Sequence, residues 1–425
     1  MNDQPFVPLL LGADINVYSM ARAFHEAYGV KTVAYGRYPS GPCYGSSIID
    51  YRVSDRNSEP EKVLENVSHV SAQFPGKTIL LLGCGDDYLT AISANLGKYP
   101  PNVVAPYVSL EQMEELIHKE RFYALCEKYG IDHPATFVYK KEMGHDFTLP
   151  FPGPFAVKPA ESATYWDHPF DTQKKAYILQ TREEVDRVID DIYGHGYEDS
   201  LIIQDFIPGG DENMRVLTCY SDEEGKVRLM CLGHVLLEEH TRHGIGNHAV
   251  IITEPGGELY DIFRHFLEEI RFVGFSNFDI KFDPRDGKYK AFEINCRQGR
   301  SNYYVTGAGY NLAKFLVEDR IEHKPQPEPV LVQNRHLWMA IPRKVAYDYI
   351  PRRFHEEMKA LEKAGAYGNP LWYSADHALL HKLRLYRIQR RQFGWYAGSM
   401  EKPKDQGPGG FYPYGYVTSV KRQSR

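Results

Sequence analysis

In the first 110 residues, apolar and polar positions alternate between two patterns. Short apolar runs at Phe6–Leu11 and Ile79–Leu82 each end at a glycine, as buried strands commonly do. Stretches with apolar side chains at helical spacing follow them, at Asn16–Tyr28 and Asp87–Leu96. This alternation predicts a parallel sheet with ligand-binding loops at the carboxyl ends of its strands. We therefore expect an α/β N-terminal domain of the Rossmann-like kind over residues 1–110.

The pattern changes after Ser109. A helix, broken once, is expected over Ser109–Tyr129, and a second over Thr181–Tyr193, where Thr181 and Glu184 form a capping-box sequence. Strands and one further helix alternate irregularly around them, which predicts an α+β domain over residues 111–320, with a lid at roughly 120–200 and a core at 201–320. The expected strands are Thr136–Val138, Phe155–Lys158, Ala176–Leu179, Leu201–Phe206, Met214–Tyr220, Val227–Gly233, Ala249–Ile252, Asn277–Asp283 and Tyr289–Asn295, and the further helix is Leu259–Phe272.

The segment Gly274–Ser301 carries the strongest chemical pattern. Two strands flank a turn sequence, Asp283–Gly287, and alternate side chains of a strand share one face. Asp279, Glu293 and Asn295 then converge on one face if the hairpin register is even, and three oxygen ligands suit Mg²⁺ beside nucleotide phosphates. The plainer interpretation is a hairpin with an exposed polar face. The side chains expected toward the core are those of Phe278, Ile280, Phe282, Phe292 and Ile294.

Two further segments suggest nucleotide binding. Lys158 ends a short apolar strand, from which its ammonium group can neutralise phosphate, and Lys119 lies upstream in a helical stretch. The extended segment Leu201–Asp211 offers backbone groups to an adenine edge and the Asp211 carboxylate to a ribose hydroxyl. Each feature has a simpler alternative: solvated lysines, and a buried strand that ends in a Pro-Gly turn.

Composition excludes several classes of function. The net charge of −6 argues against a general nucleic-acid binder, and we find no apolar run long enough to cross a bilayer. The six cysteines are scattered and form no C-x-x-C pair, which favours reduced thiols in the cytoplasm. After residue 320, a Pro-rich linker at Lys324–Pro329 leads into a basic, aromatic-rich C-terminal extension, 321–425, whose Gly407–Tyr416 stretch is not expected to be regular.

The order of these parts is similar to that of the ATP-grasp fold, and several segments together resemble D-aspartate ligases of the ATP-grasp carboxylate–amine ligase superfamily. The resemblance covers roughly residues 5–320 and is more specific than any one motif. The segments that carry it are Leu10–Arg22, Ile203–Gly209, Asn213–Leu217, Met230–His234 and Phe292–Ser301.

The resemblance implies a role for ten residues. Those implied in nucleotide and metal binding are Lys119 and Lys158 at the ATP phosphates, Gln204 and Phe206 at the adenine, Asp211 at the ribose, and Asp279, Glu293 and Asn295 at Mg²⁺. Two arginines complete the set. Arg297 would stabilise the charged intermediate, alongside Lys158, and Arg300 would bind a substrate carboxylate.

The same resemblance implies a reaction. ATP would convert a carboxylate of D-aspartate to an acylphosphate, and the side-chain amine of the lysine-type residue in a UDP-linked muropeptide would displace phosphate. The expected location is the cytoplasm, with a homo-oligomer possible. A ligase for another amino acid or amine, and a nucleotide-binding module without catalysis, remain as alternatives. The chain departs from many ATP-grasp enzymes at Ala160–His168, which contains no glycine, so Ser162, Thr164 and the later lysines would cover the phosphates.

Overall fold

A computed structural model describes residues 4–241, 244 and 246–403, without the side chains of residues 162 and 163. The Gly407–Tyr416 stretch lies outside the described residues. The chain divides into two compact units. The larger unit contains the residues up to 110, residues 210–278 and the residues from 295 onward; the smaller unit contains residues 111–209 and 279–294. The division passes through the segment expected to form the second domain.

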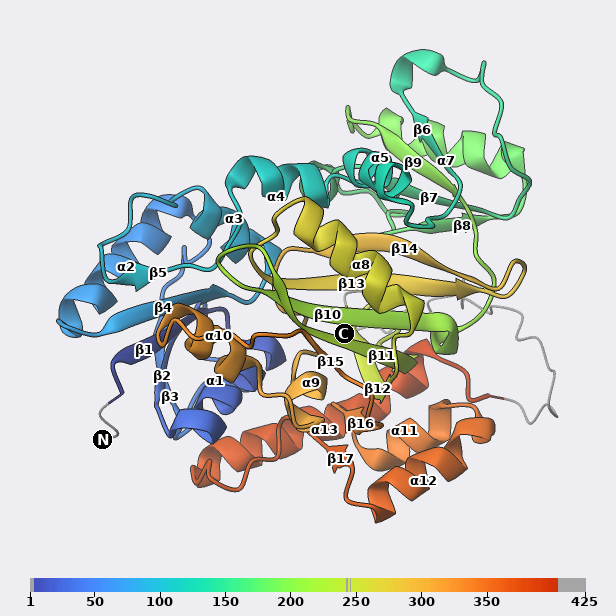
Figure 1. Ribbon diagram of the computed structural model, residues 1–425. Helices are drawn as coiled ribbons and strands as arrows, with labels where there is room; N and C mark the ends of the chain where they lie inside the picture. The colour runs from blue at the N-terminus through green and yellow to red at the C-terminus, as the bar shows by residue number, and fades with distance from the viewer. Residues whose placement is uncertain (1–3, 242–243, 245, 404–425) are drawn as a thin grey trace. The chain divides into compact units, whose positions relative to one another are not determined.

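The N-terminal part of the larger unit is a five-stranded parallel sheet, which confirms the predicted parallel arrangement. Its strand order is β3-β2-β1-β4-β5 (Figure 1). Every residue of β1 is buried, as expected for a strand covered on both faces. The elements are β1 (Phe6–Leu11), α1 (Ile15–Tyr28), β2 (Thr32–Gly36), β3 (Ile49–Val53), α2 (Pro60–Gln73), β4 (Thr78–Gly83), α3 (Asp86–Ser93) and β5 (Val103–Val104).

A second sheet has eight strands in the order β14-β13-β10-β11-β12-β16-β17, with β15 paired to β11. Strands β13 and β14 each cross the division between the units. The elements of this region are η2 (Asp211–Asn213), β10 (Met214–Ser221), β11 (Val227–Glu238), β12 (His248–Glu254), α8 (Glu258–Glu269), β13 (Gly274–Asp283), β14 (Lys288–Asn295), α9 (Tyr303–Gly307) and α10 (Leu312–Arg320).

The C-terminal segment packs onto the larger unit. Its strands β16 and β17 join the second sheet (Figure 1). Its helices pack on an apolar cluster that includes Val250, Leu337 and Tyr396. The buried carboxylate of Asp376 accepts hydrogen bonds from Tyr18 of α1 and from Ser46. The elements are β15 (Val330–Leu331), β16 (Leu337–Met339), α11 (Arg343–Tyr349), η3 (Arg352–Phe354), α12 (His355–Lys363), β17 (Tyr367–Gly368) and α13 (Leu379–Ser399).

The smaller unit is built on a four-stranded sheet in the order β6-β9-β7-β8, whose recorded pairs are antiparallel. The predicted helix after Ser109 is broken at His118, and Thr181 and Glu184 form the predicted capping box. Residues 160–168 were expected to form a loop but contain a short helix, α6. The elements are α4 (Leu110–Ile117), α5 (Lys119–Tyr129), β6 (Thr136–Tyr139), η1 (Lys141–Met143), β7 (Phe155–Pro159), α6 (Ser162–Trp166), β8 (Tyr177–Leu179), α7 (Arg182–Gly194) and β9 (Leu201–Asp205).

No helix in the described part of the chain is both long and apolar enough to span a membrane.

Candidate active site

The ten candidate residues fall into two groups, one in each unit. The smaller unit holds the two lysines, the adenine candidates and two carboxylates: Lys119, Lys158, Gln204, Phe206, Asp279 and Glu293. The larger unit holds Asp211, Asn295, Arg297 and Arg300.

Lys158 lies near the end of β7, paired with Ile202 of the neighbouring strand β9. Its ammonium nitrogen is 5.1 Å from the centroid of the Phe292 ring, a cation–π distance. The pKa of Lys158 is lowered to about 8, mainly by burial and also by the ammonium groups of Lys119 and Lys175, while Glu293 opposes this shift. The site therefore holds an ammonium group whose charge is weakly compensated, and a phosphate anion would stabilise that charge.

Glu293 is the carboxylate at the centre of these lysines. Burial alone would raise its pKa, but Lys119, Lys175 and Lys158 outweigh burial and lower the pKa below its usual value. The Asp279 carboxylate also interacts with Glu293 by a side-chain hydrogen bond and lowers the pKa. Three cationic and two anionic groups are thus brought together from α5, β7, the segment before β8, and the β13–β14 hairpin.

The donor set of the hairpin fits Mg²⁺. Asp279 and Glu293, both in the smaller unit, offer two carboxylates that hydrogen-bond to one another. The described residues contain no group of three or more His, Cys, Asp or Glu side chains arranged for a metal ion. Two carboxylates suit a hard cation that keeps several water ligands, and the part of Asn295 as a third ligand remains a prediction.

The predicted alternation of the hairpin is wrong at three positions. Lys281 was expected opposite the core but is buried, because its ammonium group donates to the Ile207 carbonyl at 2.9 Å. Phe282 was expected in the core but is only partly buried, with its ring 5.2 Å from that of Tyr289. Phe292 is likewise partly buried and lies against Lys158. Hydrogen bonding and ring contacts within the smaller unit override the simple two-residue period.

The two adenine candidates lie together around the end of β9. Gln204 is 1% exposed, and its amide nitrogen donates to the Thr136 hydroxyl at 2.9 Å. The Phe206 backbone N–H donates to the Pro154 carbonyl at 3.0 Å, and the Lys281 ammonium lies 5.2 Å from the Phe206 ring centroid. The Gln204 side chain is thus hydrogen-bonded to a residue of the neighbouring strand β6, and Phe206 is more exposed to solvent than Gln204.

In the larger unit, Arg297 forms a two-point ion pair with Asp86 at the start of α3. Its Nε and Nη2 donate to the two carboxylate oxygens at 2.8 and 3.0 Å. Nη2 also donates to the Asn295 amide oxygen at 3.2 Å. The side chain of Asp86 is 64% exposed, so solvent weakens the pair. Arg297 is therefore oriented by its neighbours while its charge remains available to an anion.

A buried amide holds the loop that carries both arginines. Gln298 has no exposed surface, and its amide nitrogen donates to the Gly83 carbonyl and the Cys84 sulfur at 3.3 and 3.1 Å. Asn16 of α1 donates to the Gln298 carbonyl at 3.1 Å. The loop after β14 is thus fixed to the carboxyl end of β4 and to the first turn of α1.

Arg300 lines a cavity of about 240 Å³ within the larger unit. Its guanidinium group lies 3.8 Å from a carboxylate oxygen of Asp14 and 3.8 Å from one of Glu239. Asp14 caps α1 through its other oxygen, which accepts from the backbone of Asn16 and Val17. Burial raises the pKa of Asp14, and Arg300 partly offsets that rise. The cavity thus combines one guanidinium group with two carboxylates.

Asp211 lies in η2, and one of its carboxylate oxygens is already engaged. That oxygen accepts from the Glu238 backbone and lies 2.8 Å from the His240 ring nitrogen. Burial lowers the pKa of His240, but the bond to Asp211 outweighs it and raises the pKa. That Asp211 binds the ribose remains a prediction, and the bond would involve its second carboxylate oxygen.

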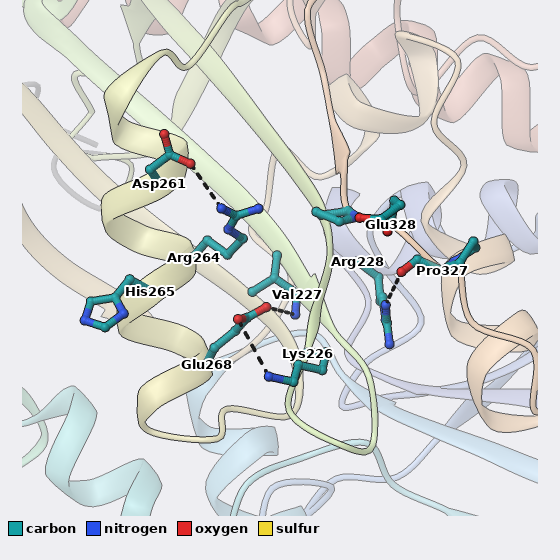
Figure 2. A pocket seen from close by; sticks show the side chains of 10 residues that line it. Lys226, Val227, Arg228, Asp261, Arg264, His265, Glu268, Pro327 and Glu328 are labelled. Carbon is teal, nitrogen blue, oxygen red and sulfur yellow. Dashed lines mark hydrogen bonds and ion pairs between the residues drawn. The ribbon is translucent and has the colours of Figure 1, made fainter.

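Another cavity, of about 360 Å³, contains none of the ten candidates (Figure 2). Most of its charged side chains bind one another or the backbone: Arg264 pairs with Asp261 at 3.2 Å, and Lys226 with Glu268 at 3.9 Å. Arg228 donates to the Pro327 carbonyl at 2.9 Å. This cavity is larger, but most of its charges are compensated, so it is a weaker candidate for a binding site.

Three residues at these sites were not among the predicted ones: Gln298, Asp14 and Glu239. Lys175 is one of the later lysines that the sequence analysis placed at the phosphates, and that role remains a prediction. Asp14 precedes a helical stretch and is recognisable as an N-cap, which explains its type without indicating a cavity. Nothing in the local sequence around Glu239 or Gln298 indicates their partners, which are distant along the chain.

No protein-family model matches the chain. Among curated proteins, the chain is 42% identical over 393 residues to a D-aspartate ligase of Enterococcus faecium (strain Aus0004), which covers 89% of this chain and 93% of that protein.

Solved structures show the fold. An N5-carboxyaminoimidazole synthetase from Staphylococcus aureus complexed with ADP has a TM-score of 0.59 at 14% identity, covering 85% of this chain and 88% of that one. The biotin carboxylase domain of a Hydrogenobacter thermophilus 2-oxoglutarate carboxylase, in complex with MgADP, ADP and bicarbonate, has a TM-score of 0.58 at 14% identity, covering 79% and 74%. Sequence identity of 14% shows only a shared fold, whereas the 42% identity to the Enterococcus relative shows the family. The chain belongs to the D-aspartate ligases, which are ATP-grasp carboxylate–amine ligases that form a C–N bond.

Proposed function

We propose that this enzyme uses ATP and Mg²⁺ to join D-aspartate to the side-chain amine of the lysine-type residue in a UDP-linked muropeptide. The observation that carries the proposal is the cluster of Lys119, Lys158 and Lys175 around the Asp279–Glu293 carboxylates. Cationic groups around a pair of hard oxygen ligands are what a nucleotide triphosphate and its metal ion require. The substrate assignment rests on the D-aspartate ligase of Enterococcus faecium.

The proposed reaction has two steps. A carboxylate oxygen of D-aspartate attacks the γ-phosphorus of ATP, which forms an acylphosphate and releases ADP. The amine nitrogen then attacks the acyl carbon, so a C–N bond forms, phosphate leaves and the amine loses a proton. Neither step needs a side-chain nucleophile.

Each group of residues has a proposed part in this reaction. Lys119 and Lys158 bind the phosphates, with Phe206 and the Gln204 backbone beside the adenine and Asp211 at the ribose. Asp279, Glu293 and Asn295 hold Mg²⁺, which supplies positive charge to the phosphate oxygens when it is bound. Arg297 stabilises charge that develops during acyl transfer, and Arg300 binds a substrate carboxylate.

We also propose that the N-terminal sheet is Rossmann-like, since its five strands follow the order β3-β2-β1-β4-β5, and that the enzyme acts in the cytoplasm. All six cysteines are free and buried, which supports a reducing compartment. A homo-oligomer stays a prediction.

The test is phosphate release from ATP and Mg²⁺ with a panel of D- and L-amino acids, with and without a lysine-containing muropeptide. Release that needs D-aspartate and the muropeptide together is expected, and the mass of the product identifies the new bond. Phosphate release with another amino acid would support the same reaction with a different substrate. The absence of release with every pair would contradict the proposed function and leave a nucleotide-binding protein.

A further inference from the structure

The cavity beside Arg300 has a wall that the C-terminal helix α13 provides. Several hydrogen bonds fasten this helix to the rest of the larger unit, three of them from residues spread along its length. His381 lies 2.6 Å from the Pro42 carbonyl, Gln389 donates to the Ala340 carbonyl at 2.7 Å, and Tyr396 donates to the Glu238 carbonyl at 2.9 Å. Pro42 and Ala340 line the cavity themselves, so the helix is fixed directly at the cavity's edges.

Gln392 lies on the same face of α13 as Gln389 and Tyr396 and also lines the cavity. Its side chain is 8% exposed, and its amide oxygen has no hydrogen-bond partner within the part of the chain that the structure describes. A buried acceptor without a donor is unfavourable in a folded protein. This oxygen is therefore suited to a donor group that a ligand brings.

The carboxylates of Asp14 and Glu239 face the same cavity. Each lies 3.8 Å from the guanidinium group of Arg300, which is longer than a hydrogen bond. Glu239 accepts from the Thr241 hydroxyl through its other oxygen, and Asp14 uses its other oxygen at the α1 cap. One oxygen of each carboxylate, and the guanidinium group between them, thus lie in loose contact that a ligand can replace.

These groups match the two ends of an amino acid. An ammonium group has three N–H donors and no acceptor, and the cavity offers three acceptors: Asp14, Glu239 and Gln392. A carboxylate matches the planar fork of Arg300. A polyphosphate is disfavoured, because two carboxylates would repel it and only one arginine would attract it.

We propose that this cavity binds the amino acid substrate: Arg300 holds the carboxylate that does not react, Asp14 and Glu239 bind the ammonium group, and Gln392 of α13 accepts its remaining N–H. This inference rests on the proposed function, because that function requires a bound amino acid. It adds that α13, from the C-terminal segment, determines which acids are accepted. An acid without an ammonium group, such as succinate, should therefore bind poorly.

The experiment uses the full-length enzyme and two independent readouts. Calorimetry measures binding of D-aspartate and succinate in the presence of a non-hydrolysable ATP analogue, and phosphate release measures turnover. The variants are Glu239→Gln and Gln392→Leu, and the matched control is Gln333→Leu, which alters an exposed glutamine outside the cavity. Circular dichroism and thermal unfolding check that each variant folds as the wild type does.

We expect the wild type to bind D-aspartate at least about tenfold more tightly than succinate, because charge-assisted hydrogen bonds are lost with the ammonium group. In both variants the affinity for D-aspartate should fall about tenfold, toward that of succinate, while KM for ATP stays within about twofold. The control should match the wild type.

Three results would overturn the inference. They are folded variants with wild-type affinity for D-aspartate, equal losses for D-aspartate and succinate, and a wild type that binds no member of the amino-acid panel. Binding that the two variants weaken, in an enzyme that shows no turnover, would support the cavity assignment and contradict the proposed function.

Discussion

The two candidate regions differ in the sign of their charge. In the smaller unit, three lysines surround the carboxylates of Asp279 and Glu293. In the larger unit, two carboxylates lie near the guanidinium group of Arg300, and Gln392 lines the same cavity. On the proposed assignment, the first arrangement binds phosphate and the second binds an ammonium group. Local charge would then separate the two small substrates, since each region disfavours the ligand of the other.

They also differ in how the charged groups are held. Lys158 is kept in a partly buried position beside the Phe292 ring, where its charge lacks full compensation. Around the cavity, by contrast, hydrogen bonds fix the helix α13 and the N-cap of α1 before any ligand arrives. The lysine cluster is therefore expected to depend strongly on pH, whereas the cavity is expected to depend on the precise shape of its wall.

Replacement of Lys158 by alanine should have the largest effect. Because this ammonium group would stabilise the transferred phosphate, we expect kcat/KM for ATP to fall by about 10²–10³-fold. Steady-state kinetics at saturating amino acid would measure the loss. Lys140→Ala, an exposed lysine of the same unit, is the control and should remain within about twofold of the wild type. Wild-type kinetics in the Lys158→Ala enzyme would show that the lysine cluster does not bind the transferred phosphate.

Arg297→Ala should reduce turnover by about 10²-fold, because one preorganised donor to a developing negative charge would be lost. Asp86→Asn is the informative companion, since it removes the ion-pair partner and keeps the arginine. Its effect should be much smaller, because the pair is solvent-exposed and contributes about 0–1 kcal/mol. Equal losses in the two variants, measured as kcat, would show that Arg297 has a structural role at this position.

These residues also show how far the sequence alone could lead. The hairpin, the strand that ends near Lys158 and the capping box at Thr181 depend on neighbours in the chain, and their patterns predicted them within a few residues. The cavity depends on residues from α1, β11–β12 and α13, which no local pattern connects. Lys281 and Phe292 were misplaced for the same reason: contacts with residues distant along the chain decided their burial.

The pH dependence of kcat/KM for ATP should distinguish the lysine cluster from the cavity. The pKa of Lys158 is lowered from 10.5 to about 8, so its positive charge is nearly complete well below pH 8, is halved at that pH and is lost as the pH rises further. Above pH 8, kcat/KM for ATP should therefore fall by about tenfold per pH unit. Lys158→Arg keeps its charge, because arginine does not deprotonate in this range, and the fall should disappear. If kcat/KM for ATP still falls above pH 8 in the Lys158→Arg enzyme, a group other than Lys158 causes the fall.

Gln298→Leu should lower the free energy of unfolding by about 1–3 kcal/mol, because the Gly83 carbonyl would lose a buried donor. Chemical denaturation measures this change. Since the same residue fixes the loop of Arg297 and Arg300, KM for the amino acid should rise more than KM for ATP. Gln333→Leu again provides the control, and equal changes in both KM values would show that the loop does not act selectively on the cavity.

The smallest effect is expected at the cavity of Figure 2. Arg264 pairs there with Asp261, whose side chain is 73% exposed, so loss of the pair should change the free energy of unfolding by no more than about 0.5 kcal/mol. Arg264→Ala should also leave kcat and both KM values within about twofold of the wild type. Charges that pair with one another on a surface attract a ligand weakly, whereas the weakly compensated Lys158 and the Gln392 oxygen, which has no partner among the described residues, are the groups proposed to bind one. A large loss of activity in Arg264→Ala would show that this criterion fails here, and the functional comparison would then have to include a third region.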